Sequence, residues 1–173
     1  MLSIEKYALP DNALLGRYAR DGIYSDCYAT EVAGTIAHAE YVTAFYTTSI
    51  FKLERAILTW VVAKPSTDDQ ARQLAEGSTD TFAAWYVEER CENQILLCDF
   101  RHRTRSWLMV APVPADRGAR TRLYFGSAVV PVQNSKSDVA SLGVAFHAVL
   151  GFHKLYSVAL LSAARSRLRA GRR

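Results

Sequence analysis

"DFRHRTRSWLMVAPVPADRGARTRLYFGSAVVPV", residues 99–132, is the stretch that decides the fold. It holds two apolar runs, each introduced by an arginine-rich turn and separated from the other by a connector rich in Pro, Asp and Gly. This pattern predicts a long β-hairpin. A sheet with one face in water alternates more cleanly between apolar and polar residues, so we expect both faces of this hairpin to be covered.

The residues before the hairpin extend it into a larger sheet. Period-two patterning predicts four successive strands within residues 79–90, 93–101, 104–113 and 120–132. Their predicted connectors, Cys91–Asn93, His102–Arg103 and Pro114–Ala119, are short enough for hairpins, which indicates an antiparallel meander. A further strand is predicted upstream, over residues 22–34.

Helices are predicted between the first strand and the meander, and again after it. Residues Thr35–Pro65 indicate two helices separated at Thr47-Thr48-Ser49. A short helix follows, with Thr67 and Gln70 as a capping box and Gly77 as its stop. The last helix is expected from a cap at Asp138 to about Arg169, a length of about 45 Å.

This order predicts the α+β class, with a curved antiparallel sheet wrapped around a long C-terminal helix. A flat two-layer sandwich does not need a terminal helix of that length. One face of the sheet is expected to meet this helix, and the other to meet the shorter helices, a second subunit, or both. The chain fits one domain, 1–173, with a lead-in at 1–21 and an arginine-rich tail at 165–173.

The element order resembles the helix-grip fold of the START-like (SRPBCC) superfamily, which includes polyketide cyclases and Bet v 1-type proteins. The resemblance covers about Gly22 to Ala170. The segments "FYTTSIFKLERAILTWVVAKPSTDDQARQLAEG", "WYVEER", "LLCDFRHRTRSWLMVAP" and "TRLYFGSAVVP" look like a bacterial family of unknown function associated with it. The superfamily usually has more strands between the helix pair and the last helix. The resemblance implies a cavity between sheet and long helix for a mainly apolar small molecule.

Composition and charge narrow the class of protein. The net charge is +4, but five arginines lie in the last nine residues, and without them it is −1. No nucleic-acid-binding face is therefore expected on the body of the domain. Cys27, Cys91 and Cys98 lack metal-ligand spacing and favour a reducing, cytoplasmic location. The start of the chain lacks the pattern of a signal peptide. Residues 139–163 are apolar enough to suggest a membrane span, but Lys154 near their centre favours a buried helix.

Six residues are candidates for ligand binding. Phe146, His153 and Tyr156 share one stripe of the last helix with Leu142, Val149 and Leu160. Trp107 and Tyr124 belong to a set of strand aromatics, with Tyr24, Tyr28, Trp85, Tyr86 and Phe125, that suits a flat ligand. Each of these aromatics is also compatible with ordinary core packing, and His153 with a hydrogen-bonded core residue.

Asp99 is the sixth candidate, and two interpretations of it are open. It forms a salt bridge with Arg101, Arg103 or Arg105 near the turn, or it accepts a hydrogen bond or a proton at the cavity mouth. The register of the hairpin decides which face it occupies.

The chain has no P-loop, dinucleotide-binding, nucleophile-elbow or zinc-protease motif, so no cofactor, metal or catalytic residue is assigned. The favoured hypothesis is a protein that binds an apolar or aromatic small molecule without catalysis. Two alternatives are an enzyme of the cyclase, hydratase or isomerase type that uses the same cavity, and a structural or interaction module that forms a homodimer through its sheet.

Overall fold

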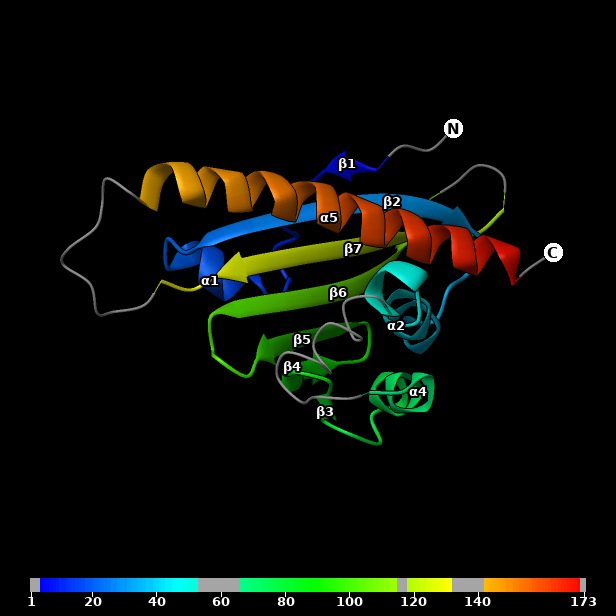
Figure 1. Ribbon diagram of the computed structural model, residues 1–173. Coiled ribbons are helices and arrows are strands. Elements are labelled where there is room, and N and C mark those ends of the chain that lie inside the picture. Colours follow the sequence, from blue (N-terminus) through cyan, green and yellow to red (C-terminus); the bar gives the residue numbers. More distant parts are fainter. Residues whose placement is uncertain (1–3, 53–65, 115–117, 132–141, 172–173) are drawn as a thin grey trace.

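The computed structural model describes residues 4–52, 66–114, 118–131 and 142–171, with the helical backbone alone for 142–154. It is an α+β fold with a curved antiparallel sheet of seven strands and a long C-terminal helix (Figure 1). The elements are β1 (Glu5–Lys6), α1 (Gly16–Arg20), β2 (Tyr24–Ala33), α2 (His38–Tyr46), α4 (Asp68–Glu76), β3 (Thr81–Phe82), β4 (Trp85–Cys91), β5 (Gln94–Asp99), β6 (Thr104–Val113), β7 (Arg120–Val129) and α5 (Leu142–Ala170).

The antiparallel meander predicted from the sequence is confirmed. The structure differs from the prediction in two respects, which are an additional short strand in the meander and regular structure in the lead-in. The strand order is β1-β2-β7-β6-β5-β4-β3, so the first long strand pairs with the last one. The first predicted strand of the meander is two strands, β3 and β4, which meet at Ala83, a non-glycine residue with φ 52°. The lead-in, for which no element was expected, forms β1 and α1.

The predicted helix signals also appear. The Thr67 hydroxyl accepts the N–H of Gln70, the Gln70 side chain accepts the N–H of Thr67, and Gly77 ends α4 with φ 78°. A helical turn begins at Ser49, and the Thr48 hydroxyl caps it by accepting the N–H of Phe51 at 3.2 Å. The rest of that predicted helix and the cap at Asp138 lie outside the described residues.

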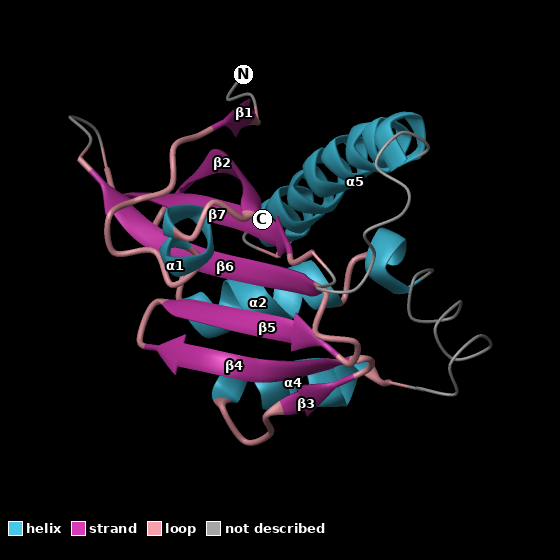
Figure 2. Cartoon of the chain, turned by 90° about the vertical axis from the view of Figure 1, so that its left-hand side faces the viewer, coloured by secondary structure: helices cyan, strands magenta, loops and turns pink. Residues whose placement is uncertain are grey.

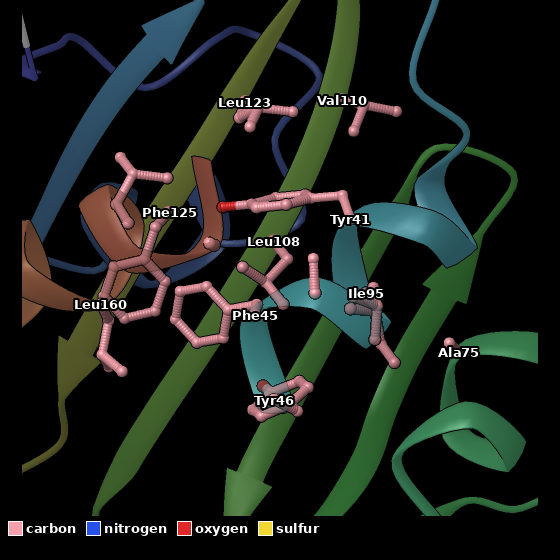
Figure 3. Packing of buried hydrophobic residues seen from close by; sticks show 14 of the residues in the cluster. Tyr41, Phe45, Tyr46, Ala75, Ile95, Leu108, Val110, Leu123, Phe125 and Leu160 are labelled. Atoms are coloured by element: carbon pink, nitrogen blue, oxygen red, sulfur yellow. The ribbon is translucent and has the colours of Figure 1, made fainter. Parts of the chain in front are cut away.

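Among the described elements, α2, α4 and α5 lie on one face of the sheet, and we call it the helix face. Figure 2 shows α2, α4 and α5 behind the strands, with α1 on the other side. The core on the helix face packs strand residues such as Leu108 and Phe125 against Phe45 of α2 and Leu160 of α5 (Figure 3). The C-terminal half of α5 is anchored there, since Leu161 and Ala164 are fully buried. No described helix is long and apolar enough to cross a membrane.

The opposite face is covered by the lead-in, and we call it the N-terminal face. Ala13 and Leu15 pack there against strand residues that include Leu96, Trp107 and Tyr124. Gly126 permits this close approach, because a Cβ atom at this position would lie 2.8 Å from Leu15 Cδ2 and 2.9 Å from Trp107 Cε3. The sheet is therefore apolar on both faces because each face has its own core. The lead-in covers part of the surface on which the homodimer hypothesis rested, and that hypothesis stays a prediction.

The Gln94 side chain fastens the lead-in to the sheet. It is 3% exposed, and its Oε1 accepts hydrogen bonds from the Leu14 N–H at 3.0 Å and from Trp107 Nε1 at 2.9 Å. Its Nε2 donates to the Asn12 carbonyl at 3.0 Å. One buried amide of β5 thus supplies partners for Trp107 of β6 and for two backbone groups of the lead-in.

The substitution Gln94→Leu is expected to lower the free energy of unfolding by about 2–4 kcal/mol, because it leaves Trp107 Nε1 and the Leu14 N–H without their acceptor. Urea denaturation followed by circular dichroism measures the change. The matched control is Gln73→Leu on the exposed side of α4, for which a change below about 0.5 kcal/mol is expected. Equal losses in the two variants would contradict this role of Gln94.

Candidate functional site

A pocket of about 270 Å³ lies on the helix face, between the sheet and the helices. Its walls are aromatic and come from distant parts of the chain. Phe45 and Tyr46 come from α2, Phe51 from the next helical turn, Phe125 from β7 and Tyr156 from α5. The remaining lining residues are Ala84, Trp85, Asp99, Phe100, Thr104, Arg105, Ser106, Ser127 and Leu160.

The sheet side of this pocket is polar where three strands meet. Ser127 is paired with Asp26 of β2 on one side and with Ser106 of β6 on the other. All three are buried, with exposed fractions of 3% for Asp26, 1% for Ser127 and 7% for Ser106. We call Asp26, Ser127 and Ser106 the polar row. Ser127 and Ser106 line the pocket, and Asp26 lies beside Ser127.

Hydrogen bonds join the polar row to its surroundings. The Ser127 hydroxyl donates to Asp26 Oδ1 at 2.5 Å. The Ser106 hydroxyl lies 3.4 Å from the Tyr46 hydroxyl, and either oxygen can be the donor. Asp26 Oδ2 is buried and has no hydrogen-bond partner among the described residues. The next row of the sheet, Tyr28, Phe125, Leu108 and Ile95, belongs to the hydrophobic core. The polar row is thus a local departure from an apolar surface.

The Asp26 carboxylate acts on its titratable neighbours. Burial raises the pKa of Tyr24 and of Tyr28, and the negative charge of Asp26 adds to both shifts. Burial, with a smaller contribution from Asp26, raises the pKa of Cys27 to about 12. These groups therefore stay protonated at neutral pH, and the Cys27 thiol is not a nucleophile there.

Asp99 lines the pocket, and its described contacts are hydrogen bonds and not the salt bridge that was one of its two expected roles. Its Oδ1 accepts the backbone N–H groups of Arg103 at 2.7 Å and Thr104 at 2.9 Å, which fixes the turn between β5 and β6. Among the described ion pairs, none joins Asp99 to Arg101, Arg103 or Arg105. Asp99 therefore organises the turn at the rim of the pocket.

Trp107 and Tyr124 require a correction. Both lie in the core of the N-terminal face, and Trp107 is fully buried there against Leu15. They therefore lie on the opposite side of the sheet from α5 and outside the pocket they were expected to line. The reason is strand alternation, which sends Ser106 and Leu108 to one face and Trp107 to the other.

The three candidates from the last helix are placed only in part. Tyr156 lines the pocket, and Leu160 one turn later also contacts it. Phe146 and His153 lie in α5, but their side chains are outside the described part of the structure. The catalytic hypothesis, which paired Asp99 with His153 or a tyrosine, stays a prediction.

Asp26, Ser106 and Ser127 were missed by sequence reasoning. They lie in the strands "YSDCYATEVA", "TRSWLMVAPV" and "RTRLYFGSAV", which contain other polar residues as well, so the local sequence does not single them out. Only the pairing of β2 with β7 shows that the three share one row.

Comparisons do not supply a name for this site. No protein-family model, curated protein or solved structure matches the chain. The site is therefore interpreted from its own geometry. Among the described residues no group of His, Cys, Asp and Glu side chains is arranged to hold a metal ion.

A second hollow, next to the start of α2, offers less chemistry. It is lined by His38, Arg90, Cys91 and Asn93, among others. The Arg90 guanidinium donates to the carbonyls of Leu74 at 2.8 Å and Thr79 at 3.4 Å, and the Asn93 amide donates to the Val110 carbonyl at 3.0 Å. These polar groups hold the local chain, which makes this hollow a weaker candidate site.

His38 in this hollow predicts a pH dependence of stability. Burial, aided by the charge of Arg90, lowers the pKa of His38 to about 4. Because the folded state keeps the imidazole neutral, protons bind the unfolded state preferentially, and stability falls as the pH drops from about 6.5 towards 4. Replacing the histidine by His38→Gln should remove roughly 1–2 kcal/mol of the stability difference between pH 7 and pH 5.

Urea denaturation of both proteins at pH 7 and pH 5 measures this difference. Carboxyl groups titrate in the same pH range in both proteins. The loss of stability between pH 7 and pH 5 in the wild type, minus the loss in the variant, therefore isolates the contribution of His38. An identical loss of stability in the two proteins would show that the imidazole is protonated as easily when folded as when unfolded.

Proposed function

We propose that this chain binds a small apolar or aromatic molecule in the pocket between the sheet and its helices. The observation that carries the proposal is the polar row beneath aromatic walls. A core whose only task is stability has no need of two buried hydroxyls that line an open space, with a buried carboxylate beside them. A pocket that holds and orients a ligand uses this combination of apolar walls and few polar groups.

The energetics support the same conclusion. The hydrogen bond between Ser127 and Asp26 satisfies one carboxylate oxygen and leaves the other without a partner among the described residues. An unsatisfied buried polar group costs about 1–3 kcal/mol, and more when it is charged. Besides Ser127, the Tyr24 side chain interacts with this carboxylate, and a bound molecule in the neighbouring pocket offers a further interaction.

The arrangement also supports a place in the START-like superfamily. A curved antiparallel sheet, a long C-terminal helix and a pocket between them are the features that the sequence resemblance implies. The chain adds a lead-in that closes the second face of the sheet. We therefore propose a helix-grip architecture in which the pocket, and not the sheet surface, is the functional feature.

Filling the pocket tests the proposal. Ser106→Met directs a longer apolar side chain into the open space, where it replaces the volume that a ligand would occupy. N-phenyl-1-naphthylamine, whose fluorescence rises in apolar surroundings, is the probe. Its dissociation constant is expected to increase about tenfold or more, the equivalent of about 1.4 kcal/mol. Fluorescence titration of the two proteins provides the measurement.

The matched control is Ser25→Met, which makes the same change on the opposite side of β2 and away from the pocket. It should leave the dissociation constant within about twofold of the wild-type value. If the wild-type protein does not bind the probe, or if both variants bind it as the wild type does, the pocket is not the binding site.

A further inference from the structure

We propose that the pocket prefers aromatic molecules that carry an organic cation, such as an ammonium group, and that Asp99 and Trp85 at its rim hold the charged end. This inference rests on the proposed function and specifies the ligand class of the same pocket. It is carried by the placement of a carboxylate beside an indole ring, together with the charges of the groups around them.

A carboxylate and an indole lie side by side at the rim of the pocket. Asp99 of β5 and Trp85 of β4 are directly opposite each other in the antiparallel pairing of these strands, and both line the pocket. The Cβ atoms of residues paired in this way lie about 4.5–5.5 Å apart. Phe100, which follows Asp99, also lines the pocket and is 41% exposed. The rim therefore places a negative charge beside two aromatic side chains.

The turn holds the Asp99 carboxylate through one of its two oxygens. Oδ1 accepts the backbone N–H groups of Arg103 and Thr104, whereas Oδ2 forms no hydrogen bond or ion pair with any described residue. A carboxylate oxygen accepts hydrogen bonds and binds most strongly to a charged donor such as an ammonium group. Oδ2 is therefore positioned for the cationic end of a molecule in the pocket.

Trp85 offers an aromatic surface that suits the same charge. Indole is the side-chain ring that attracts a cation most strongly, when the cation lies within about 6 Å of the ring centre. Arg101 already lies over Phe100, with its Cζ atom 5.2 Å from the ring centroid, so a ring of this rim does hold a cation. In the part of the chain that the structure describes, neither a cation nor another ring is stacked on Trp85, which leaves the indole for a ligand.

Arg105 also borders the pocket, but its charge is balanced on the N-terminal face. Its guanidinium lies over the ring of Tyr18 of α1, with Cζ 4.9 Å from the ring centroid, and its Nε lies 2.6 Å from Glu88 Oε2. Arg17 shares Glu88 at 3.1 Å and pairs with Glu89 at 2.9 Å. Two cations and two carboxylates thus form a neutral network with α1, and the guanidinium of Arg105 belongs to it as one charged group.

The charges that remain near the pocket favour a cation. Arg101 and Arg103 are exposed, so water and salt screen them. Asp26, beside the pocket, is 3% exposed, and its contacts with Ser127 and Tyr24 are with uncharged groups. Because a buried charge is screened much less than an exposed one, Asp26 adds to the attraction that Asp99 exerts on a cation and to the repulsion of a carboxylate.

Three naphthalene probes of similar size test the inference at neutral pH. 1-Naphthylmethylamine is a cation, 1-naphthalenemethanol is uncharged, and 1-naphthoate is an anion. Isothermal titration calorimetry of the full chain is expected to give binding of the amine about tenfold tighter than that of the alcohol, and weaker binding still for the naphthoate. The uncharged N-phenyl-1-naphthylamine, the probe of the proposed function, is titrated in parallel.

Substitutions at the rim locate the preference for the amine. Asp99→Asn keeps an oxygen that can accept the two backbone N–H groups but removes the charge. It should bring the dissociation constants of the amine and the alcohol to within about twofold of each other. Trp85→Leu removes the ring and should reduce the preference by about threefold. The control Asp69→Asn removes one charge from a 76% exposed side chain of α4 and should leave the preference unchanged.

The outcomes separate this inference from the proposed function. If N-phenyl-1-naphthylamine does not bind the wild-type protein, both are overturned. If it binds, but the naphthoate or the alcohol binds as tightly as the amine, the pocket binds ligands and the preference for a cation is wrong. A preference that survives Asp99→Asn or Trp85→Leu unchanged would also overturn the inference, because the selecting groups would lie elsewhere. The comparison of probes on the wild-type protein stands even if a substitution impairs folding.

Discussion

The burial of both faces of the central strands is the constraint on which the rest of this structure depends. Successive residues of β6 and β7 point to opposite faces, so each strand contributes to two cores at once. On one face the helices cover the sheet, and on the other the lead-in does. A shift of one residue in pairing would exchange the two sets of side chains, moving Ser106 and Ser127 away from the helices. Register therefore fixes the core and the site together.

The pairing of β2 with β7 is the part of this constraint that positions the candidate site. It closes the sheet between segments about a hundred residues apart and sets Asp26 opposite Ser127. Pairing between segments so far apart lowers the entropy of the chain, and the burial of apolar surface on both faces of the sheet offsets this cost. The polar row is positioned by the same hydrogen-bond ladder that holds the sheet. A site built on strands is held more rigidly than one built on loops.

Much of the architecture could be predicted because its signals are local. The capping box at Thr67 and Gln70 fixes the start of α4 within a single turn. Strand alternation and short connectors predicted the meander from β4 to β7, and the long apolar periodicity predicted α5. The lead-in escaped prediction because α1 has only five residues and the segment is held by tertiary contacts, such as those of Gln94 with Asn12 and Leu14 and of Arg105 with Tyr18.

The site was harder to predict because successive residues of a strand point to opposite faces, and the sequence does not show which of the two sets faces the helices. Ser106 and Trp107 are neighbours in sequence, and the apolar residues around them suit either face. With both faces buried, hydropathy does not distinguish them, so Trp107 and Tyr124 were assigned to the wrong core. Asp99 was ambiguous for the same reason, and its contacts with the backbone of Arg103 and Thr104 depend on the geometry of a turn. The small polar residues of the row gave no distinct signal, because Asp26 and Ser106 have polar neighbours in the same strands.

A crystal structure of the protein with N-phenyl-1-naphthylamine bound tests the central claim most directly. The account predicts that the naphthalene ring lies between Phe45, Phe125 and Tyr156, in the pocket that Ser106 and Ser127 line. If side chains fill this space, or if the ring lies on another part of the protein, the polar row is an internal feature of the core and the account is contradicted.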